Sequence, residues 1–175
     1  MEFIKMLWLI LPAYAANIFP LLLHGKTPMD LGKKFIDGKR ILGDGKTIEG
    51  FIVGTVAGLF YGSLIWLVSP PYMATARYYG FELPLMTPFI GFLLGLGTMI
   101  GDSIGSFIKR RLGMKRGHEA LVLDQLPFFL MAFFFASFFV EVTIAMWIMG
   151  AIFTLVIHKA ANVIAYIIRV KSVPW

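Results

Sequence analysis

The sequence predicts an all-α, polytopic membrane protein with about five transmembrane helices in a single domain, residues 1–175. Of the 175 residues, 58% are hydrophobic and 15% are charged, whereas soluble domains average about 45–50% apolar and about 25% charged residues. The apolar residues gather in five stretches near the length of about 20 residues that a helix needs to cross a bilayer core. No cysteine is present, which excludes disulfides, thiolate metal ligands and a cysteine nucleophile.

The five predicted membrane segments span about 3–23, 50–68, 83–107, 121–140 and 142–158. The first contains Pro12, Asn17 and Pro20, which interrupt its apolar run, so we expect a retained helix and not a cleaved signal peptide. Glu141 marks a tight turn between the last two segments. The mixed tail, 159–171, is interpreted as an amphipathic helix that follows the membrane surface.

Basic residues concentrate in two of the connecting loops. Loop 24–49 holds six and loop 108–120 holds five, whereas loop 69–82 holds only Arg77. Because short cytoplasmic loops carry the excess of Lys and Arg, we expect both basic loops and the C-terminus in the cytoplasm and the N-terminus outside.

Glycines recur every four residues in the second and third segments. The series are Gly50, Gly54, Gly58 and Gly62; Gly91 and Gly95; and Gly97, Gly101 and Gly105. Small residues at this spacing let helix backbones approach closely in lipid. We expect them to pack helices, either within one chain or between two copies in a homodimer.

Asp102 lies at the end of the long apolar run of the third segment. A carboxylate inside a membrane costs about 2.5–3.5 kcal/mol on insertion scales and therefore indicates a functional site. On a helix Asp102, Ser106 and Lys109 share one face, with Ser103 and Arg110 beside it. Gly113 is expected to end this helix. The alternative is that Asp102 is only a buried partner for a lysine or arginine.

Asp124 opens the fourth segment three residues before Pro127. It is either an N-cap of that helix or a metal ligand that faces Asp102, and the two roles are compatible. Mg²⁺ usually binds one or two carboxylates together with substrate phosphates. We therefore predict a site for Mg²⁺, as two ions, on Asp102 and Asp124.

The first basic loop contains a glycine-rich turn with Gly45, Lys46, Thr47 and Gly50. It lacks the Walker A pattern, but it places a lysine and a hydroxyl at a helix N-terminus, where backbone N–H groups bind anions. The alternative is a capped turn without a ligand. Asn17 contacts either a neighbouring helix or the substrate. His24, His118 and His158 are too scattered to form a ligand set, and His118 with Glu119 either has a surface role or lies near the site.

Two elements resemble the signature of the membrane phosphatidate cytidylyltransferases. One is Ser106-Phe107-Ile108-Lys109-Arg110 followed by Lys115 and Asp124, and the other is Gly45-Lys46-Thr47-x-x-Gly50. The small archaeal branch of this family, the CDP-archaeol synthases, is similar in length and in three patterns. These are Pro12-x-Tyr14-x-Ala16-Asn17-x-x-Pro20, Asp30-x-Gly32-Lys33 and Gly43-Asp44-x-Lys46-Thr47.

The resemblance implies a Mg²⁺-dependent nucleotidyltransferase that converts CTP and 2,3-bis-geranylgeranyl-glycerol 1-phosphate to a CDP-activated ether lipid and pyrophosphate. Its partners would be CTP, the lipid phosphate and the bilayer, with no nucleic acid, and the site would lie at the cytoplasmic face of the cell membrane. The expected catalytic residues are Asp102, Asp124, Lys109 and Lys46. The expected binding residues are Gly45, Lys46, Thr47, Gly50, Ser103, Ser106, Lys109, Arg110, Lys115, Arg116 and Asn17.

Two other function classes stay open at this point. A small transporter or ion pathway could use Asp102 as its coupling carboxylate, although the sequence holds no inverted repeat of that segment. A non-catalytic membrane subunit is the other alternative. For any single basic residue of the loops, orientation or contact with anionic lipid heads is the simpler explanation.

Overall fold

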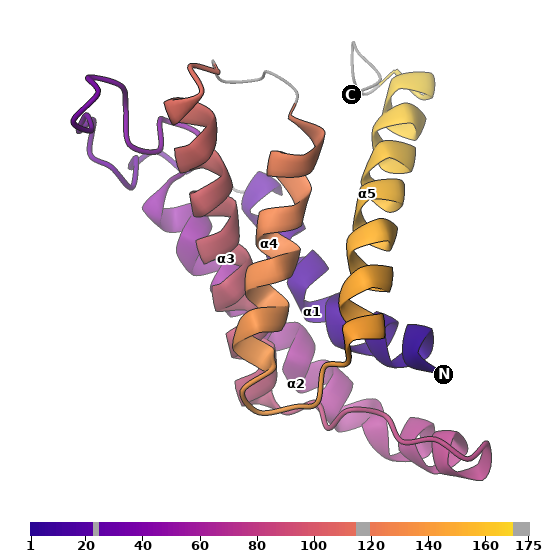
Figure 1. The fold of residues 1–175 in the computed structure, drawn as a ribbon. Coiled ribbons are helices and arrows are strands. Elements are labelled where there is room, and N and C mark those ends of the chain that lie inside the picture. Colours follow the sequence, from indigo (N-terminus) through magenta and orange to yellow (C-terminus); the bar gives the residue numbers. More distant parts are fainter. Residues whose placement is uncertain (23–24, 115–119, 170–175) are drawn as a thin grey trace.

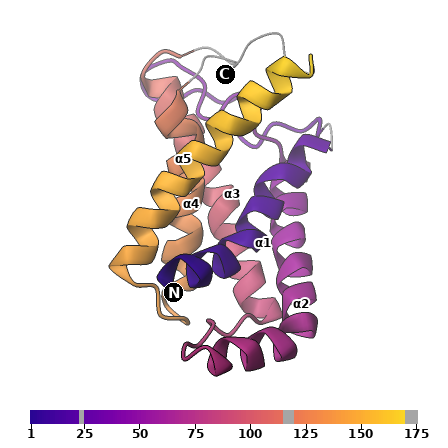
Figure 2. The same cartoon turned by 90° about the vertical axis from the view of Figure 1, so that its right-hand side faces the viewer.

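A computed structural model describes residues 1–22, 25–114 and 120–169 and has the expected all-helical fold (Figures 1 and 2). Its five helices are α1 (Glu2–Leu22), α2 (Ile48–Tyr78), α3 (Pro88–Arg111), α4 (Leu121–Ala136) and α5 (Ile144–Ile167). Four of them, α1, α2, α3 and α5, are long and apolar enough to cross a membrane. The chain is a multi-pass membrane protein.

Helix α4 is shorter than expected. The sequence predicted a segment over 121–140, but α4 ends at Ala136 and has 16 residues. At about 1.5 Å per residue its length is about 24 Å, less than the ~30 Å of a bilayer core. Phe128, Phe129 and Phe133 are almost fully buried against the other helices, so this helix is held mainly by protein contacts.

Three further bounds differ from the expected ones, and each has a local cause. Helix α2 continues past its expected end at residue 68 to Tyr78. Pro70 and Pro71 lie within it and bend it (Figure 2), but they do not end it. Helix α3 begins five residues later than expected because Thr87 caps it and Pro88 occupies its first position. Its last turn extends to Arg111, and Gly113 follows with a left-handed φ of 75°.

The tail is helical, as expected, as far as the structure shows it, because residues 159–167 continue α5 without a break. Its position along the membrane surface stays a prediction. No glycine or proline occurs between Gly150 and Pro174, so nothing in this stretch interrupts the helix.

The glycine series pack helices within the chain, as expected from their spacing. A Cβ built on Gly58 would lie 2.5 Å from the Cα of Gly95, and one on Gly62 would lie 2.4 Å from the Cα of Gly91, so α2 and α3 touch backbone to backbone. On the other side of α3, a Cβ on Gly101 would lie 2.0 Å from the carbonyl oxygen of Pro127 in α4. Helix α3 is therefore packed closely between α2 and α4, and its contact with α4 at Gly101 lies next to Asp102.

The described parts of both basic loops lie at the same end of the bundle as the end of α5, and the N-terminus lies away from them (Figure 1). The side of the membrane to which this end belongs stays a prediction.

Candidate active site

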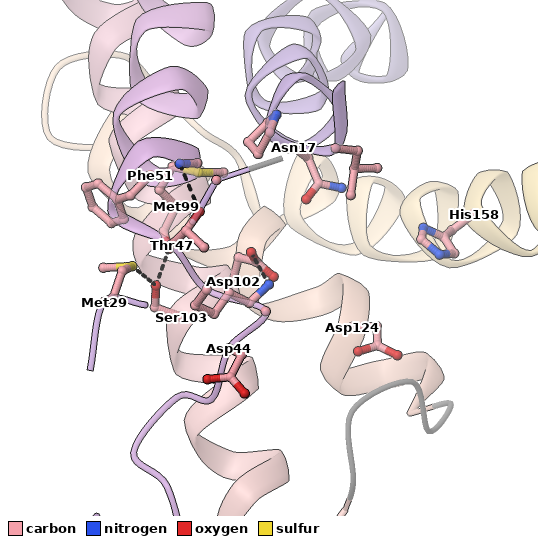
Figure 3. Close-up of a pocket in the computed structure, with 16 residues that line it drawn as sticks. Asn17, Met29, Asp44, Thr47, Phe51, Met99, Asp102, Ser103, Asp124 and His158 are labelled. Carbon is pink, nitrogen blue, oxygen red and sulfur yellow. Dashed lines mark hydrogen bonds and ion pairs between the residues drawn. The ribbon is translucent and has the colours of Figure 1, made fainter. Parts of the chain in front are cut away.

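A cavity of about 390 Å³, lined by charged, polar and apolar side chains, lies at the end of the bundle that carries the basic loops. All five helices and the α1–α2 loop, residues 25–47, contribute to its wall. The lining residues include Asn17, Lys46, Gly50, Asp102, Asp124 and His158. Figure 3 shows that the labelled side chains of this set surround one space.

Lys46 and Asp102 form an ion pair across this cavity. Lys46 Nζ lies 2.5 Å from Asp102 Oδ2, and the two side chains are 23% and 28% exposed. Asp102 therefore has a lysine partner, as the simpler alternative proposed, but the pair is open to the cavity and not enclosed in the core. Open ion pairs are weak, so a ligand with stronger charges can displace this one.

Asp124 forms a second ion pair, with Lys109 of α3. Its other oxygen, Oδ2, accepts a hydrogen bond from the backbone N–H of Ala120 at 3.1 Å. Ala120 is the N-cap of α4, so the expectation that Asp124 itself is the N-cap was wrong. Asp124 nevertheless satisfies a backbone donor at the start of α4 and faces the cavity at the same time.

A second cavity of about 450 Å³ adjoins the first and is strongly basic. Asp44, Gly45 and Lys46 line both cavities, so the glycine-rich turn separates them. Ser106, Lys109 and Arg110 of α3 line the second cavity. Arg110 Nε is buried there without a hydrogen-bond partner in the described part of the chain. A buried donor left unpaired is costly, and an anion would satisfy it.

The α1–α2 loop is ordered by a single buried carboxylate. Asp30, whose side chain is fully buried, accepts hydrogen bonds from the backbone N–H groups of Gly32, Leu42 and Gly43. It also accepts two from Arg40, at 3.1 Å from Nε and 2.6 Å from an Nη. The hydrogen bond from Arg40, helped by the backbone donors, holds the pKa of Asp30 well below its usual range. The loop is structured, and Asp30 fixes the backbone just before the glycine-rich turn.

Arg111 attaches the same loop to the end of α3. Its guanidinium lies 4.9 Å from the ring centroid of Phe35 and 4.8 Å from that of Phe107. It also donates to the carbonyl oxygen of Arg40 and lies 3.3 Å from a carboxylate oxygen of Asp37. Lys39 Nζ donates to the Arg111 carbonyl oxygen at 2.8 Å. Arg111 thus has structural partners, although its Nε and Nη1, like Arg110 Nε, are buried without a hydrogen-bond partner among the described residues.

The glycine-rich turn ends in a conventional helix cap. Thr47 is the N-cap of α2, and its Oγ1 accepts from the Gly50 backbone N–H at 3.2 Å. The alternative of a capped turn is thus present in the structure, and the turn also lines both cavities through Gly45 and Lys46.

Most of the residues expected at the site lie around the two cavities. Those lining the first are Asn17, Gly45, Lys46, Thr47, Gly50, Asp102, Ser103 and Asp124. Those lining the second are Gly45, Lys46, Ser106, Lys109 and Arg110. Lys115 and Arg116, as well as His24 and His118, lie outside the described residues.

The sequence interpretation missed two ionisable residues in the wall of the first cavity. Asp44, which stands in the glycine-rich turn and pairs with Arg40 at 2.8 Å, received no role. His158 was excluded from a ligand set and received no role at the site, but it lines the first cavity. Its signal was present, because it continues the i, i+4 stripe of Met146, Gly150 and Thr154, which are buried residues of α5.

The donor set fits a hard divalent cation only together with a ligand. No cluster of three or more His, Cys, Asp or Glu side chains able to hold a metal occurs among the described residues. Asp102 and Asp124 nevertheless both line the first cavity, and Mg²⁺ usually takes one or two carboxylates plus substrate phosphates. The residues therefore fit Mg²⁺ if phosphates complete its coordination.

Comparisons with known proteins agree across the whole chain. Residues 1–175 match the CarS-like family described as CDP-archaeol synthase. A protein named CDP-archaeol synthase from Methanopyrus kandleri is 45% identical, covering 100% of this chain and 95% of its own length. Another of that name from Pyrococcus horikoshii is 43% identical, covering 99% and 98%. A solved structure described as an intramembrane enzyme for archaeal membrane lipid biosynthesis has a TM-score of 0.75 and 38% identity, covering 89% of this chain and 91% of that one.

Proposed function

The chain belongs to the CDP-archaeol synthase family, and from this premise we propose that it transfers the cytidylyl group of CTP to a lipid phosphate. The lipid is the dialkylglycerol phosphate of archaeal ether-lipid synthesis, 2,3-bis-geranylgeranyl-glycerol 1-phosphate. The enzyme is a nucleotidyltransferase, and its products are the CDP-activated lipid and pyrophosphate.

An oxygen of the lipid phosphate is the nucleophile in this reaction. It forms a bond to the α-phosphorus of CTP while the bond from that phosphorus to the β-bridging oxygen breaks, and pyrophosphate leaves. The attacking group is already ionised, so the protein needs no activated serine or cysteine. It has to hold two polyanions in line and neutralise the charge that develops.

The two adjoining cavities suit this division of labour. The basic second cavity, with Lys109 and Arg110, would hold the β- and γ-phosphates that depart as pyrophosphate. The first cavity would hold the lipid phosphate. Lys46 lines both cavities, so we place the α-phosphate beside it. In this arrangement Lys46 and Lys109 exchange their carboxylate partners for phosphate oxygens.

Asp102 and Asp124, released from their lysines, would hold Mg²⁺ together with the phosphates. When bound, the metal supplies charge neutralisation and a template for the two phosphate groups. Asn17 and Ser103 line the same wall and would orient the lipid headgroup by hydrogen bonds. The glycine series that suggested a homodimer pack within the chain, so this site needs residues of one chain only.

A single observation carries this proposal. Lys46 lines both the first cavity, which holds Asp102 and Asp124, and the basic second cavity. The test is release of pyrophosphate by purified protein supplied with Mg²⁺, CTP and the lipid phosphate. We expect release with CTP, and a comparison with dCTP, ATP and UTP measures base and sugar selectivity. Absence of release from folded protein would contradict the proposal.

The transporter hypothesis is not favoured. It predicts uptake into proteoliposomes without CTP, and nothing in the site requires such a path, since Asp102 is paired at the edge of the bundle with a loop lysine. The cytoplasmic location of the site is part of the proposal, because CTP is a cytoplasmic nucleotide and the basic loops favour that side.

A further inference from the structure

The α1–α2 loop contains a small hairpin, residues 33–41, that is closed by backbone hydrogen bonds. The N–H of Phe35 donates to the carbonyl oxygen of Lys39 at 2.8 Å, and the N–H of Gly38 donates to the carbonyl oxygen of Phe35 at 2.9 Å. Gly38, with a φ of 76°, supplies the left-handed residue that such a tight turn needs. Ile36 therefore stands at the tip of a hydrogen-bonded turn.

The inner side of this hairpin is fixed to the bundle. The Phe35 ring meets the Phe107 ring of α3 edge to face, with centroids 5.3 Å apart, and the Arg111 guanidinium lies over both rings. At the other end of the hairpin, Arg40 is held by the buried carboxylate of Asp30. The hairpin is thus presented in one position, so a partner that binds its tip costs it little conformational freedom.

The tip of the hairpin is apolar, although tight turns on a protein surface usually carry Gly, Pro, Asn, Asp or Ser. Ile36 is 94% exposed, and the Phe35 ring beside it is still 40% exposed. Leu31, just before the hairpin, is 65% exposed. Packing within the chain therefore does not account for a large aliphatic side chain at this tip.

Two lysines with uncompensated charge precede the tip. Lys33 and Lys34 are exposed, and neither forms an ion pair within the part of the chain that the structure describes. The other charged groups of the hairpin have partners: Asp37 lies near Arg111, Lys39 donates to a carbonyl oxygen of α3, and Arg40 pairs with Asp30. The exposed surface around Ile36 is therefore apolar and positively charged.

The hairpin lies where the bundle leaves the membrane. Figure 1 shows the α1–α2 loop projecting sideways beyond α3, at the end of the bundle that carries the basic loops. Arg111, which holds the hairpin, is the last residue of α3, and α2 begins at Ile48, directly after the loop. Both helices are long and apolar enough to cross a membrane. A hairpin that projects sideways from their ends lies at the level of the lipid headgroups.

We propose that this hairpin docks on the surface of the surrounding bilayer, with Ile36 inserted between lipid headgroups and with Lys33 and Lys34 bound to anionic headgroups. Apolar side chains beside basic ones are typical of segments that lie in a membrane interface, where the apolar groups enter the acyl boundary and the cations stay with lipid phosphates. Because Arg40 and Asp30 join the hairpin to the glycine-rich turn, docking also holds that turn at the membrane surface. The inference goes beyond the proposed function and does not depend on it.

Charge complementarity favours anionic lipid over a second copy of the chain. In a symmetric pair the same surface patch meets itself, so Lys33 and Lys34 of the two hairpins would face each other. Like charges that face each other are destabilising, whereas anionic headgroups neutralise them.

The depth of the tip in a bilayer tests the docking directly, and the chain is suited to labelling because it contains no cysteine. Ile36→Cys with a fluorescent label is placed, as a single copy per disc, in nanodiscs of phosphatidylcholine with or without about one-third phosphatidylglycerol. A water-soluble quencher then measures the exposure of the label. Ile52→Cys, on a part of α2 where Ile52 is 56% exposed, provides the value for a label in lipid. We expect the label at residue 36 to be protected in anionic discs and less protected in neutral ones.

Removal of one lysine should weaken the docking. One basic residue near an anionic surface changes the ratio of docked to undocked hairpins about fivefold. Lys33→Gln, added to the labelled protein, should therefore lower the ratio of protected to quenched label about fivefold in anionic discs. The matched control is Lys159→Gln, which removes the same charge from an exposed position of α5 outside the loop and should change this ratio less than about twofold. In neutral discs the two variants should behave alike.

Three results would overturn the inference. Quenching of the label at residue 36 in anionic discs as complete as that of the free fluorophore in water would place the hairpin in solvent. Equal protection in neutral and anionic discs, or equal effects of the two lysine variants, would exclude anionic headgroups as the partner. Protection that arises only when a disc holds two copies would assign the tip to a second chain. These measurements need no substrate, so a failure to release pyrophosphate would refute the proposed function and leave them unaffected.

Discussion

Lys46 Nζ lies 2.5 Å from Asp102 Oδ2, and this contact joins the α1–α2 loop to α3 at the end of the bundle that carries the basic loops. A second lysine–aspartate pair, Lys109 with Asp124, joins α3 to α4. In the structure each acid expected to bind a metal is thus neutralised by a base expected to bind phosphate. Under the proposed function, substrate binding would exchange partners within a set of charges that already balances, and these pairs keep the ligand-free site from holding unpaired charge near the membrane.

The first prediction concerns Lys46. Replacing it with methionine keeps the length of the side chain but removes the charge that faces both cavities. We expect kcat to fall by about 10²-fold or more, the range seen when one group that stabilises developing charge is deleted. Pyrophosphate release measures the loss. Lys34→Met is the matched control, because Lys34 is exposed in the same loop and lines neither cavity. Equal losses in both variants would mean that Lys46 acts only through net charge.

The second prediction separates the two roles of Asp124. Asp124→Asn keeps an oxygen that can accept from the Ala120 N–H, as Asp124 Oδ2 does at 3.1 Å, but it removes the charge. A purely structural residue would tolerate this change, with a melting temperature close to that of the unaltered protein. We expect the melting temperature to hold and turnover to fall about 10²-fold or more. Retained turnover would remove Asp124 from the proposed metal site.

More of the site than of the loop that supports it could be predicted from the sequence. The stripe of Asp102, Ser106 and Lys109 follows from helical periodicity alone, and the structure places those residues on the two cavities. The partners of these groups were not predictable, because Lys46 is 56 residues away from Asp102 in sequence. The same limit hid the role of Asp30, whose partners are mainly backbone N–H groups that carry no sequence signal.

The helix ends show the same division. Thr87 with Pro88 and the Gly113 turn are local signals, and they account for the bounds of α3. The end of α4 at Ala136 is not a local property of its apolar sequence, because the hydropathy continues beyond it. The length of α4 was therefore overestimated from the sequence. His158 was missed because its neighbours in the cavity, Asn17 and Asp124, belong to distant segments.

The third prediction concerns the close contact of α3 with α4. Gly101→Ala adds a methyl group where a Cβ would lie 2.0 Å from the carbonyl oxygen of Pro127. The two backbones must separate, and overpacking of this kind costs about 1–3 kcal/mol. Because Asp102 and Asp124 stand on these two helices, we expect a lower melting temperature together with reduced turnover. Ile104→Ala, on the exposed face of α3, is the control, and a harmless Gly101→Ala would contradict the packing.

The fourth prediction concerns Asp30, which acts by positioning the glycine-rich turn. Asp30→Asn breaks the buried pair with Arg40, and loss of one partner of such a pair costs about 3 kcal/mol or more. We expect a lower melting temperature and a KM for CTP raised more than the KM for the lipid. A change that only weakened the bundle would raise both equally. Asp37→Asn, in the same loop and partly exposed, should have a much smaller effect.

The lowered pKa of Asp30 also fixes the sign of a pH effect. A depressed pKa in the folded state stabilises the protein above the unfolded value of about 4, and this contribution is lost as the pH falls toward the folded value. The difference in melting temperature between the unaltered protein and Asp30→Asn should therefore be largest near neutral pH and shrink in acid. A difference that is constant from neutral pH into strong acid would show that the charge of Asp30 is not what stabilises the loop.

The fifth prediction is that Mg²⁺ and CTP each bind more tightly when the other is bound. In the structure Asp102 is paired with Lys46, so a cation alone must displace the lysine without compensation. A triphosphate that takes over Lys46 releases the carboxylate, and coupling between two ligands is reciprocal. Calorimetric titration with Mn²⁺, used as a probe for Mg²⁺, measures this coupling. The Kd for Mn²⁺ should be lower when a nonhydrolysable CTP analogue is present, once the ion bound by the free analogue has been subtracted. Lys46→Met should tighten the binding of the ion alone and weaken the coupling, whereas Asp102→Asn should weaken binding of the ion in both conditions. Independent binding of the two ligands to the unaltered protein would contradict the exchange of partners.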